Sequence, residues 1–388
     1  MRLLHTGDWH VGRTLHRRQR LDECAAVLGE LVEVAAAEAV DAVLVCGDVF
    51  EHFAPSAEAE SIVYRTLLAL RATGAEVVVI PGNHDYARRF AAVEGLFAAA
   101  GVTAVSSVRR PDQGGIVRLT ARDGTALEVA CLPWVGERTL SSAADLMLAQ
   151  ERPYQEYADE LASLIAALCA PLDPAAVTVL AGHLFVSGAR TGGGERDLTI
   201  GQVYAVSPAA LPTTVQYIAL GHVHRPQDVP GAATPARYAG SPLQLDFGEA
   251  AQRKTVTIVD VEPARPPRTR EVEITRGRSL LEIRGTLEEL AERAGEFGEA
   301  WLKVELVCDG PAPGLADRVR DLLPNALEVR LDYEREDAER RAGELRRLSA
   351  HDLFARYFRE THGADADQAV MKLFDELLEE VGGAPTQA

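Results

Sequence analysis

Side chains that could bind metal ions or transfer protons recur in this sequence at one kind of position. Each lies at the end of a short apolar run or a few residues after it. The set is Asp8, His10, Asp48, Asn83, His84, Asp85, His183, His222 and His224. Carboxylate, imidazole and amide oxygen groups without a thiolate suit Mn²⁺, Fe or Zn²⁺ better than a structural zinc cluster. One bridging carboxylate with three more ligands on each side would hold two ions about 3.5–4 Å apart.

Each short pattern is weak when it is taken alone. Asp-X-His and Gly-Asp most often mark a turn or a helix cap, Gly-Asn-His-Asp also occurs in turns, and Gly-His-X-His is more specific. Five such patterns at the ends of apolar runs predict a metal site when they occur together. A glycine precedes each group, and we expect it to let the backbone turn off the strand and approach the ions closely.

The elements that must position these side chains are predicted from hydrophobic periodicity. Continuous apolar runs typical of strands buried on both faces occur at residues 3–8, 42–48, 77–84, 177–183 and 217–222. Helical spacing of apolar residues occurs at residues 22–40 and 57–73. The alternation predicts a layered α/β fold whose active site lies at the carboxyl ends of the strands.

The remainder of the chain is predicted to form smaller units. A Pro/Arg-rich segment at residues 262–268 indicates a linker. Four strands and two helices of a small α+β domain are expected after it, with strands near residues 270–274, 280–284, 301–307 and 327–332 and helices near 286–294 and 313–323. Two amphipathic helices follow, so the predicted domains are residues 1–262, 269–335 and 337–388.

Bulk composition limits the class of protein. The 388 residues are 47% hydrophobic and 25% charged, as in soluble globular proteins, and no apolar run reaches the roughly 18 residues of a membrane span. Five scattered cysteines and a start without signal-peptide character favour reduced thiols in a cytoplasmic protein. The formal net charge of −18 argues against a free-standing nucleic-acid binder, but bound cations would add positive charge, so DNA is not excluded as a substrate.

The order of the five patterns resembles the calcineurin-like metallophosphoesterase superfamily. Four longer segments are similar to the SbcD nuclease subunits of bacterial SbcCD DNA-repair complexes, namely residues 4–12, 182–189, 221–227 and 238–249. The resemblance covers nearly the whole chain. It implies a layered β-sandwich flanked by helices, with a small α+β capping domain and a C-terminal helix pair.

The resemblance also implies a role for each candidate site residue. One ion, usually Mn²⁺ in this family, would be bound by Asp8, His10 and His224, the other by Asn83, His183 and His222, and Asp48 would bridge them. A water whose pKa the cations lower would attack the phosphorus. His84 would stabilise charge or protonate the leaving oxygen, and Asp85 would orient His84 through a hydrogen bond, the alternative for Asp85 being a turn cap.

The activity implied by the resemblance is cleavage of DNA. It comprises 3′→5′ double-strand exonuclease and single-strand endonuclease activity in DNA end processing, repair and hairpin cleavage. An SMC-type ATPase, SbcC, would bind the helices near residues 349–381, and the nuclease would be a nucleoid-associated homodimer within a heterotetramer. Two alternatives are a metallophosphoesterase acting on small phosphodiesters and a non-catalytic scaffold that recruits the ATPase.

Basic residues beside the metal motifs are candidates for contacts with the DNA backbone. They are Arg13, His16, Arg17, Arg18 and Arg20 after the first motif, and Arg88 and Arg89 after the third. A solvated helix start is the alternative for residues 13–20. Glu51 stands where the family commonly has Asp, outside the expected ligands, and residues 190–194 are expected to be a flexible connection.

Overall fold

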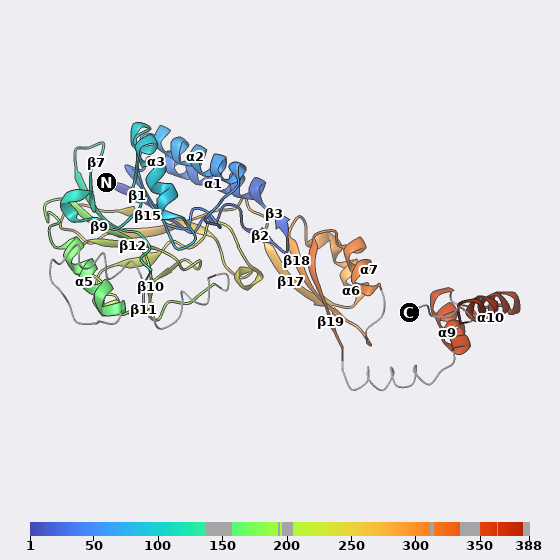
Figure 1. Cartoon of the computed structure of the whole chain (residues 1–388). Helices are drawn as coiled ribbons and strands as arrows, with labels where there is room; N and C mark the ends of the chain where they lie inside the picture. The colour runs from blue at the N-terminus through green and yellow to red at the C-terminus, as the bar shows by residue number, and fades with distance from the viewer. Residues whose placement is uncertain are drawn as a thin grey trace. The chain divides into compact units, whose positions relative to one another are not determined.

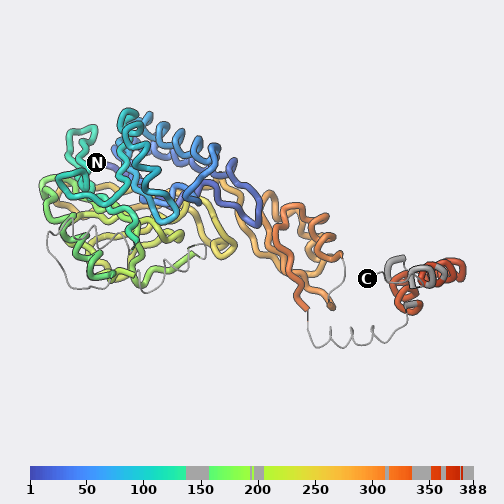
Figure 2. The backbone as a smooth tube through the Cα atoms, in the orientation of Figure 1, coloured from blue at the N-terminus to red at the C-terminus, as the bar shows by residue number. Residues whose placement is uncertain are grey.

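The computed structural model describes residues 1–136, 157–192, 195, 205–310, 314–333, 350–362 and 364–382. The chain divides into two compact units, one formed by residues 1–282 with 299–302 and the other by residues 283–298 with 303–388. Figures 1 and 2 colour the chain by residue number, so that the first unit runs from blue to orange-yellow and the second is orange to red.

Two six-stranded sheets form the centre of the first unit. One has the order β16-β15-β1-β4-β5-β6. Its strands are β1 (Arg2–Thr6), β4 (Ala42–Cys46), β5 (Glu76–Ile80), β6 (Val102–Ala104), β15 (Thr255–Asp260) and β16 (Arg268–Glu273). The other has the order β13-β14-β12-β9-β8-β7. Its strands are β7 (Ile116–Thr120), β8 (Ala126–Leu132), β9 (Val177–His183), β12 (Tyr217–Gly221), β13 (Gln227–Asp228) and β14 (Ala236–Tyr238).

The central strands of both sheets are parallel, which fits their continuous apolar runs. β1, β4, β5 and β6 pair in parallel, and so do β8, β9, β12 and β14. All five residues of β4 are buried, which fits a strand covered on both faces. Carboxyl ends of neighbouring parallel strands lie at the same edge of a sheet, so the residues that follow them are brought together.

Helices cover the outer faces of the two sheets. α1 (Leu21–Ala37), α2 (Ala57–Ala72) and α3 (Ala87–Ala99) lie on the side of β1, and α5 (Tyr157–Cys169) lies on the side of β9 and β12 (Figure 1). One apolar cluster lies between the helices and each sheet, and a third, including Leu44 and Val179, lies between the sheets. The predicted fold class is confirmed: this is a layered β-sandwich flanked by helices.

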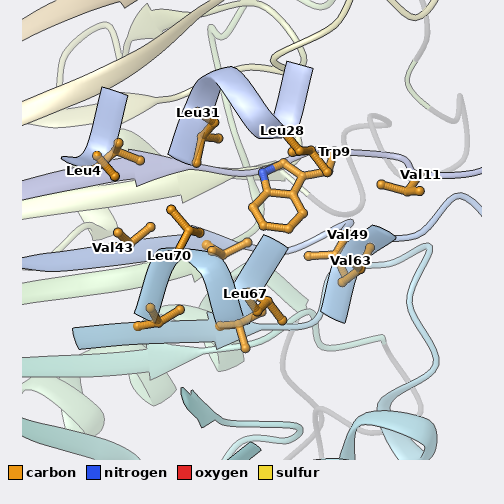
Figure 3. Packing of buried hydrophobic residues seen from close by; sticks show 14 of the residues in the cluster. Leu4, Trp9, Val11, Leu28, Leu31, Val43, Val49, Val63, Leu67 and Leu70 are labelled. Carbon is orange, nitrogen blue, oxygen red and sulfur yellow. The ribbon is translucent and has the colours of Figure 1, made fainter. Parts of the chain in front are cut away.

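Trp9 anchors the loop that carries the first two candidate ligands. Its indole is 1% exposed and lies among Leu28, Val63 and Leu67 (Figure 3), while its Nε1 donates a hydrogen bond to Thr6 Oγ1 at 3.0 Å. Because Trp9 stands between Asp8 and His10 in the chain, its burial holds the backbone on both sides of it. A fully buried aromatic side chain contributes about 1.5–3 kcal/mol of stability.

The interpretation of residues 262–268 as a linker is wrong. β15 and β16 form an antiparallel hairpin in which Asp260 pairs with Arg268, so this segment is the loop of the hairpin. The strand expected near residues 270–274 therefore belongs to the first sheet, and the second unit begins at Ile283. Proline and glycine indicate turns as well as linkers, and the sequence pattern does not distinguish the two.

The other three strands and the two helices predicted for the small α+β domain are present. A three-stranded sheet has the order β17-β18-β19, formed by β17 (Leu280–Gly285), β18 (Trp301–Val307) and β19 (Ala326–Asp332). It is accompanied by α6 (Leu287–Glu292) and α7 (Leu315–Leu322). The side chain of Thr286 caps α6 by accepting from Glu289 N, and the Glu289 carboxylate accepts from Thr286 N in return.

Two further helices follow, α9 (Ala350–His362) and α10 (Gln368–Gly382), as predicted. They contact each other through Phe354 and Phe374, whose rings are stacked with centroids 4.0 Å apart. Among the helices that the structure describes, none has the length and apolar character needed to cross a membrane. The five cysteines are free thiols.

Candidate metal centre

The candidate ligands come from strand ends of both sheets. Asp8 follows β1, Asp48 follows β4, and Asn83 and His84 follow β5 in the first sheet. In the second sheet, the side chains at the corresponding strand ends are those of His183, which ends β9, and of His222 and His224, which follow β12. All seven predicted ligands are buried, although polar groups are costly to remove from water unless they are paired.

Four of these residues have a left-handed backbone. The φ angles are 51° at Asp8, 46° at His10, 49° at Asp48 and 104° at His222. Each such conformation costs on the order of 1–3 kcal/mol for a residue with a Cβ and persists only when the surroundings impose it. Here Asp8 N donates to Gly47 O at 2.9 Å, and His10 N donates to Asp48 O at 2.9 Å. The loops after β1 and β4 therefore hold each other in the strained conformation.

The glycines before the ligands act mainly by allowing close packing, which differs from our expectation. Of these five glycines only Gly47, with φ of 88°, has a left-handed backbone. A Cβ on Gly221 would lie 1.8 Å from Cys46 O, and one on Gly82 would lie 2.2 Å from Asp48 Oδ1. No side chain fits at either position. The strand ends of the two sheets can approach because these residues have none.

Asp48 lies at the centre of two groups of ligand atoms. Those of Asp48, His183 and His222 are within 4.8 Å of one another, and so are those of His10, Asp48 and His84. The Asn83 Oδ1 joins the first group, at 3.0 Å from His183 Nε2 and 2.8 Å from His222 Nδ1. A carboxylate shared between two groups is the arrangement expected of a bridging ligand.

The donor set fits divalent cations. His10 Nδ1 donates to Glu51 Oε2 at 2.8 Å, which leaves Nε2 as a lone-pair nitrogen, and this buried atom has no hydrogen-bond partner in the structure. When His183 is neutral, its Nδ1 donates to Cys46 O at 2.8 Å and its Nε2 presents a lone pair toward the Asp48 carboxylate, 3.4 Å away. Converging lone pairs are unfavourable unless a cation lies between them.

The buried carboxylates also indicate a site for divalent cations. Asp8 and Asp48 have no ion pair with Arg or Lys among the described residues, and their charged neighbours are histidines. Burial lowers the pKa of His183, but the carboxylates of Asp48 and Asp8 outweigh it and raise this pKa to about 9. Burial raises the pKa of Asp8 to about 6 against the opposing effect of the histidines. The buried carboxylates thus favour a positive charge beside them, which a proton on His183 or a bound cation can supply.

His84 is held by the loop after β4. Its Nδ1 donates to Glu51 O at 2.9 Å, and its backbone N donates to Asp48 Oδ1 at 2.8 Å. Burial lowers the pKa of His84 to about 4, with Asp48 opposing the shift. Because its ligand atom belongs to the group with His10 and Asp48, the imidazole can reach either an ion or a phosphate.

Asp85 does not bind His84 as expected. No hydrogen bond joins the two side chains within the part of the chain that the structure describes. The Asp85 carboxylate instead accepts from three backbone N–H groups, those of Gly82 at 2.8 Å, Phe50 at 3.0 Å and Val49 at 3.2 Å. This is the turn-capping alternative, extended to a second loop, so Asp85 fastens the loop after β5 to the loop after β4.

Glu51 is a functional side chain that the sequence reasoning left out. Its carboxylate binds His10 through Oε2 and Arg13 Nη1 through Oε1 at 3.2 Å, while its carbonyl holds His84. Burial raises the pKa of Glu51, but the hydrogen bond from His10 outweighs it and lowers this pKa to about 2. Its place three residues after Asp48 was the available signal.

His224 is supported by a second buried carboxylate. Its Nδ1 donates to Glu249 Oε1 at 3.0 Å, and Glu249 Oε2 forms an ion pair with Lys254 Nζ at 2.7 Å. Lys254 also donates to Ser241 Oγ at 2.9 Å and to His224 O at 3.1 Å. The segment at residues 238–249 therefore contributes the side chains that orient this imidazole.

Trp134 is a second residue that sequence reasoning missed. Its ring is stacked on that of His222, with centroids 5.2 Å apart and planes inclined by 24°. It also meets His183 edge to face with centroids 6.1 Å apart. No pattern around Trp134 indicates this role, because the contact depends on the order of the strands β8, β9 and β12 in the second sheet.

Comparisons with known proteins agree with this geometry. The calcineurin-like phosphoesterase family model matches residues 1–226, and the model described as the type 5 capsule protein repressor C-terminal domain matches residues 276–362. The SbcD component of the nuclease SbcCD from Bacillus subtilis is 33% identical over 389 residues, covering 97% of each chain. That of Escherichia coli K12 is 31% identical over 412 residues, covering 99% of each. The protein of the same name from Rhodobacter capsulatus is 34% identical over 280 residues, 69% of this chain and 68% of that one.

This chain belongs to the SbcD family of calcineurin-like phosphoesterases.

The basic segment of this SbcD family member is a β-hairpin, so the alternative of a solvated helix start is wrong. β2 (Thr14–Leu15) pairs antiparallel with β3 (Arg18–Gln19). The turn residues His16 and Arg17 have φ angles of 46° and 68°, as in a type I′ turn. His16, Arg17 and Arg18 are exposed.

Arg20, predicted as a DNA contact, is buried. Its guanidinium donates to Glu23 at 2.8 and 3.1 Å and to Gln244 O at 2.5 Å, and it is 2% exposed. The physical reason is that Glu23 and Gln244 saturate a cation inside the unit, where no phosphate can reach it.

The other predicted DNA contacts differ in exposure. Arg13 is ion-paired with Glu51, and Arg89 forms an ion pair with Glu60 at 2.7 Å. Arg88 is exposed. The surface charge available beside the site therefore consists mainly of the hairpin and Arg88.

Proposed function

We propose that this chain is a DNA nuclease that hydrolyses phosphodiester bonds with two divalent cations. The donor set suits Mn²⁺, Fe or Zn²⁺, and we propose Mn²⁺ because the resemblance to the SbcD family implies it. The observation that carries the proposal is the buried Nε2 of His10, which has no partner although it lies in a cluster of ligand-type side chains. The relatives named as components of the nuclease SbcCD support DNA as the substrate.

The proposed ligand sets share Asp48. Asp8, His10 and His224 would hold one cation, and Asn83, His183 and His222 the other. In support, Asp48 Oδ2 lies 3.6 Å from His10 Nε2 and 3.4 Å from His183 Nε2. When bound, the cations neutralise phosphate charge and make a water acidic enough to act as a nucleophile.

His84 is proposed as the residue that stabilises charge on the phosphate or protonates the leaving oxygen. Because its Nδ1 hydrogen is committed to Glu51 O, only Nε2 can exchange a proton with the substrate. Asp85 keeps the loop in place and acts as a positioning residue.

The proposed substrates are duplex ends, cut as a 3′→5′ exonuclease, and single strands, cut as an endonuclease. These activities serve DNA end processing, repair and hairpin cleavage. His16, Arg17, Arg18 and Arg88 would contact the DNA backbone, and the small α+β unit would help to position the DNA. Backbone contacts of this kind carry no base specificity.

The proposed partner is an SMC-type ATPase, SbcC, bound by α9 and α10. Apolar side chains remain exposed at four-residue spacing on both helices, Leu353 and Tyr357 on α9 and Leu373 and Leu377 on α10, which is the pattern of a helix that packs against another helix. We also propose a homodimer within a heterotetramer in the cytoplasm, associated with the nucleoid.

One set of reactions tests the function. The pure chain, with and without SbcC and ATP, is incubated in Mn²⁺ with end-labelled duplex, circular single strands and a small phosphodiester. We expect cleavage of DNA. Turnover of the small phosphodiester without any cleavage of DNA would establish a different metallophosphoesterase, and no turnover of any substrate would leave a scaffold for the ATPase.

The variant His84→Ala tests the assignment at the centre. We expect it to bind Mn²⁺ as the native chain does and to lose cleavage, because His84 is not among the proposed ligands. His351→Ala on α9, assayed without SbcC, is the matched control, since His351 pairs with Asp375 and lies in the other unit. Loss of a cation from His84→Ala would make His84 a ligand, and normal cleavage would remove it from the chemistry.

A further inference from the structure

Two large aromatic side chains are exposed side by side on the loops that carry the metal centre. Phe53 is 53% exposed and Tyr86 is 45% exposed. Their ring centroids lie 6.2 Å apart with the planes inclined by 39°. Most aromatic side chains of the first unit are buried in its apolar clusters, so a paired exposure needs a reason.

The pair lies close to the reacting groups. Phe53 is two residues after Glu51, which binds His10, and Tyr86 is two residues after His84. Two residues span at most about 7 Å along the chain. A group resting on these rings is therefore within a few nucleotide steps of a phosphate at the metal centre, since one step of a stacked strand is about 3.4 Å.

Hydrogen bonds join the loop after β4, which carries Phe53, to the loop after β5, which carries Tyr86. Asp85 accepts from Val49 N and Phe50 N, and His84 Nδ1 donates to Glu51 O. These three bonds join the loop of Tyr86 to the loop of Phe53 immediately before each ring. The rings therefore form a preorganised surface, and little conformational entropy is lost when a flat group binds to it.

We propose that Phe53 and Tyr86 form a stacking platform for an unpaired nucleobase of the DNA strand being cut. The inference rests on the proposed nuclease function and deepens it by naming the part of the substrate that the site selects. Every base has a flat π-face, so stacking is independent of sequence. Bases inside a duplex are covered by their neighbours, so the platform favours single strands and frayed ends.

Charge beside the rings favours a nucleic acid over an apolar partner. Arg88 is exposed two residues after Tyr86, where it can hold a phosphate next to the stacked base. A second copy of this chain is the other occupant to consider, because exposed apolar side chains can also pack against another protein. The molar mass in solution distinguishes the two occupants.

The test compares single-stranded oligonucleotides that carry one abasic position, moved in steps along the strand, with the native chain and with the double variant Phe53→Ala/Tyr86→Ala in Mn²⁺. Base stacking on an aromatic ring changes affinity by roughly five- to 150-fold. We expect the native chain to cut slower by such a factor at one phosphate near the missing base. The double variant should cut the intact strand slower by a similar factor and ignore the abasic position.

The conservative pair Phe53→Tyr/Tyr86→Phe is the matched control and should keep the native rate and the abasic effect. Fluorescence of 2-aminopurine in the strand, measured with Ca²⁺ to prevent cleavage, should be quenched by the native chain and by the conservative pair, and less by the double variant.

The outcomes distinguish an error in the proposed nuclease function from an error in the proposed stacking platform. If the native chain cuts no DNA either alone or with SbcC and ATP, the nuclease function itself is wrong. If it cuts intact and abasic strands equally well, or if the double variant keeps the abasic effect, the platform is wrong and the function stands. A lower molar mass of the double variant would assign these rings to a contact between two copies of the chain and would also overturn the platform.

Discussion

Replacement of Glu51 by glutamine tests how the site prepares its first imidazole. The Glu51 carboxylate accepts from His10 Nδ1 at 2.8 Å, and its negative charge makes the opposite nitrogen of His10 a stronger electron donor. Glutamine has the same length and retains an oxygen acceptor, so the variant removes the charge alone. The Glu51 side chain is 11% exposed, and water cannot replace the lost charge.

The expected magnitude follows from the partners of each histidine. Removing an outer partner of a metal-binding histidine typically weakens metal affinity by about 10–100-fold, which is about 1.4–2.7 kcal/mol. His183 is held by the Cys46 carbonyl and does not contact Glu51. One of two cations should therefore bind more weakly in Glu51→Gln, and the other should bind as before.

The assay is a titration of the metal-free protein with Mn²⁺, in which free Mn²⁺ is measured by electron paramagnetic resonance. Glu60→Gln on α2 is the matched control, because it removes a carboxylate that is ion-paired with Arg89 on α3. Unchanged binding of both cations by Glu51→Gln, or equal weakening of both, would refute the argument that Glu51 acts through His10.

Three further predictions concern stability. Lys254→Met should destabilise the protein by about 3–5 kcal/mol in urea unfolding, because it leaves the Glu249 carboxylate buried without its cation. Adding Glu249→Gln should recover much of the lost stability, and equal destabilisation by the single and double variants would contradict this argument. Gly221→Ala should yield no soluble folded protein in an expression and circular dichroism test, because a Cβ there would lie 1.8 Å from Cys46 O, and a native-like spectrum would contradict the packing argument. Burial raises the pKa of Glu23, but its ion pair with Arg20 outweighs this effect and lowers the pKa below 4.5. The stabilisation by Glu23 should therefore be complete above pH 4.5 and decline as the pH falls below that value. Glu23→Gln should lose that part of the acid dependence of unfolding, and an unchanged dependence of stability on pH would count against the argument.

Local patterns of apolar and polar residues predicted most of the strands and helices in the first unit. The strands β1, β4, β5, β9 and β12 lie where apolar runs predicted them, and α1 and α2 begin and end within a few residues of the expected bounds. These elements depend on the order of apolar and polar side chains, and that order is a property of the sequence.

Errors arose where one local pattern is compatible with two structures. The Pro-rich segment at residues 262–268 suits a linker and a hairpin loop equally, and the basic segment at residues 13–20 suits a helix start and a hairpin. Arg20 resembles its exposed neighbours in the sequence, but it is buried because Glu23 and Gln244 lie beside it.

The sequence by itself determined which chemical groups stand at the strand ends, and therefore that the site is built from nitrogen and oxygen donors. Only the tertiary structure decided which groups act on one another. Glu51 lies 41 residues from His10, and Glu249 lies 25 residues from His224. Each pair meets because segments that are far apart in the chain pack together at one edge of the two sheets. The number of residues between two side chains does not predict whether they come into contact.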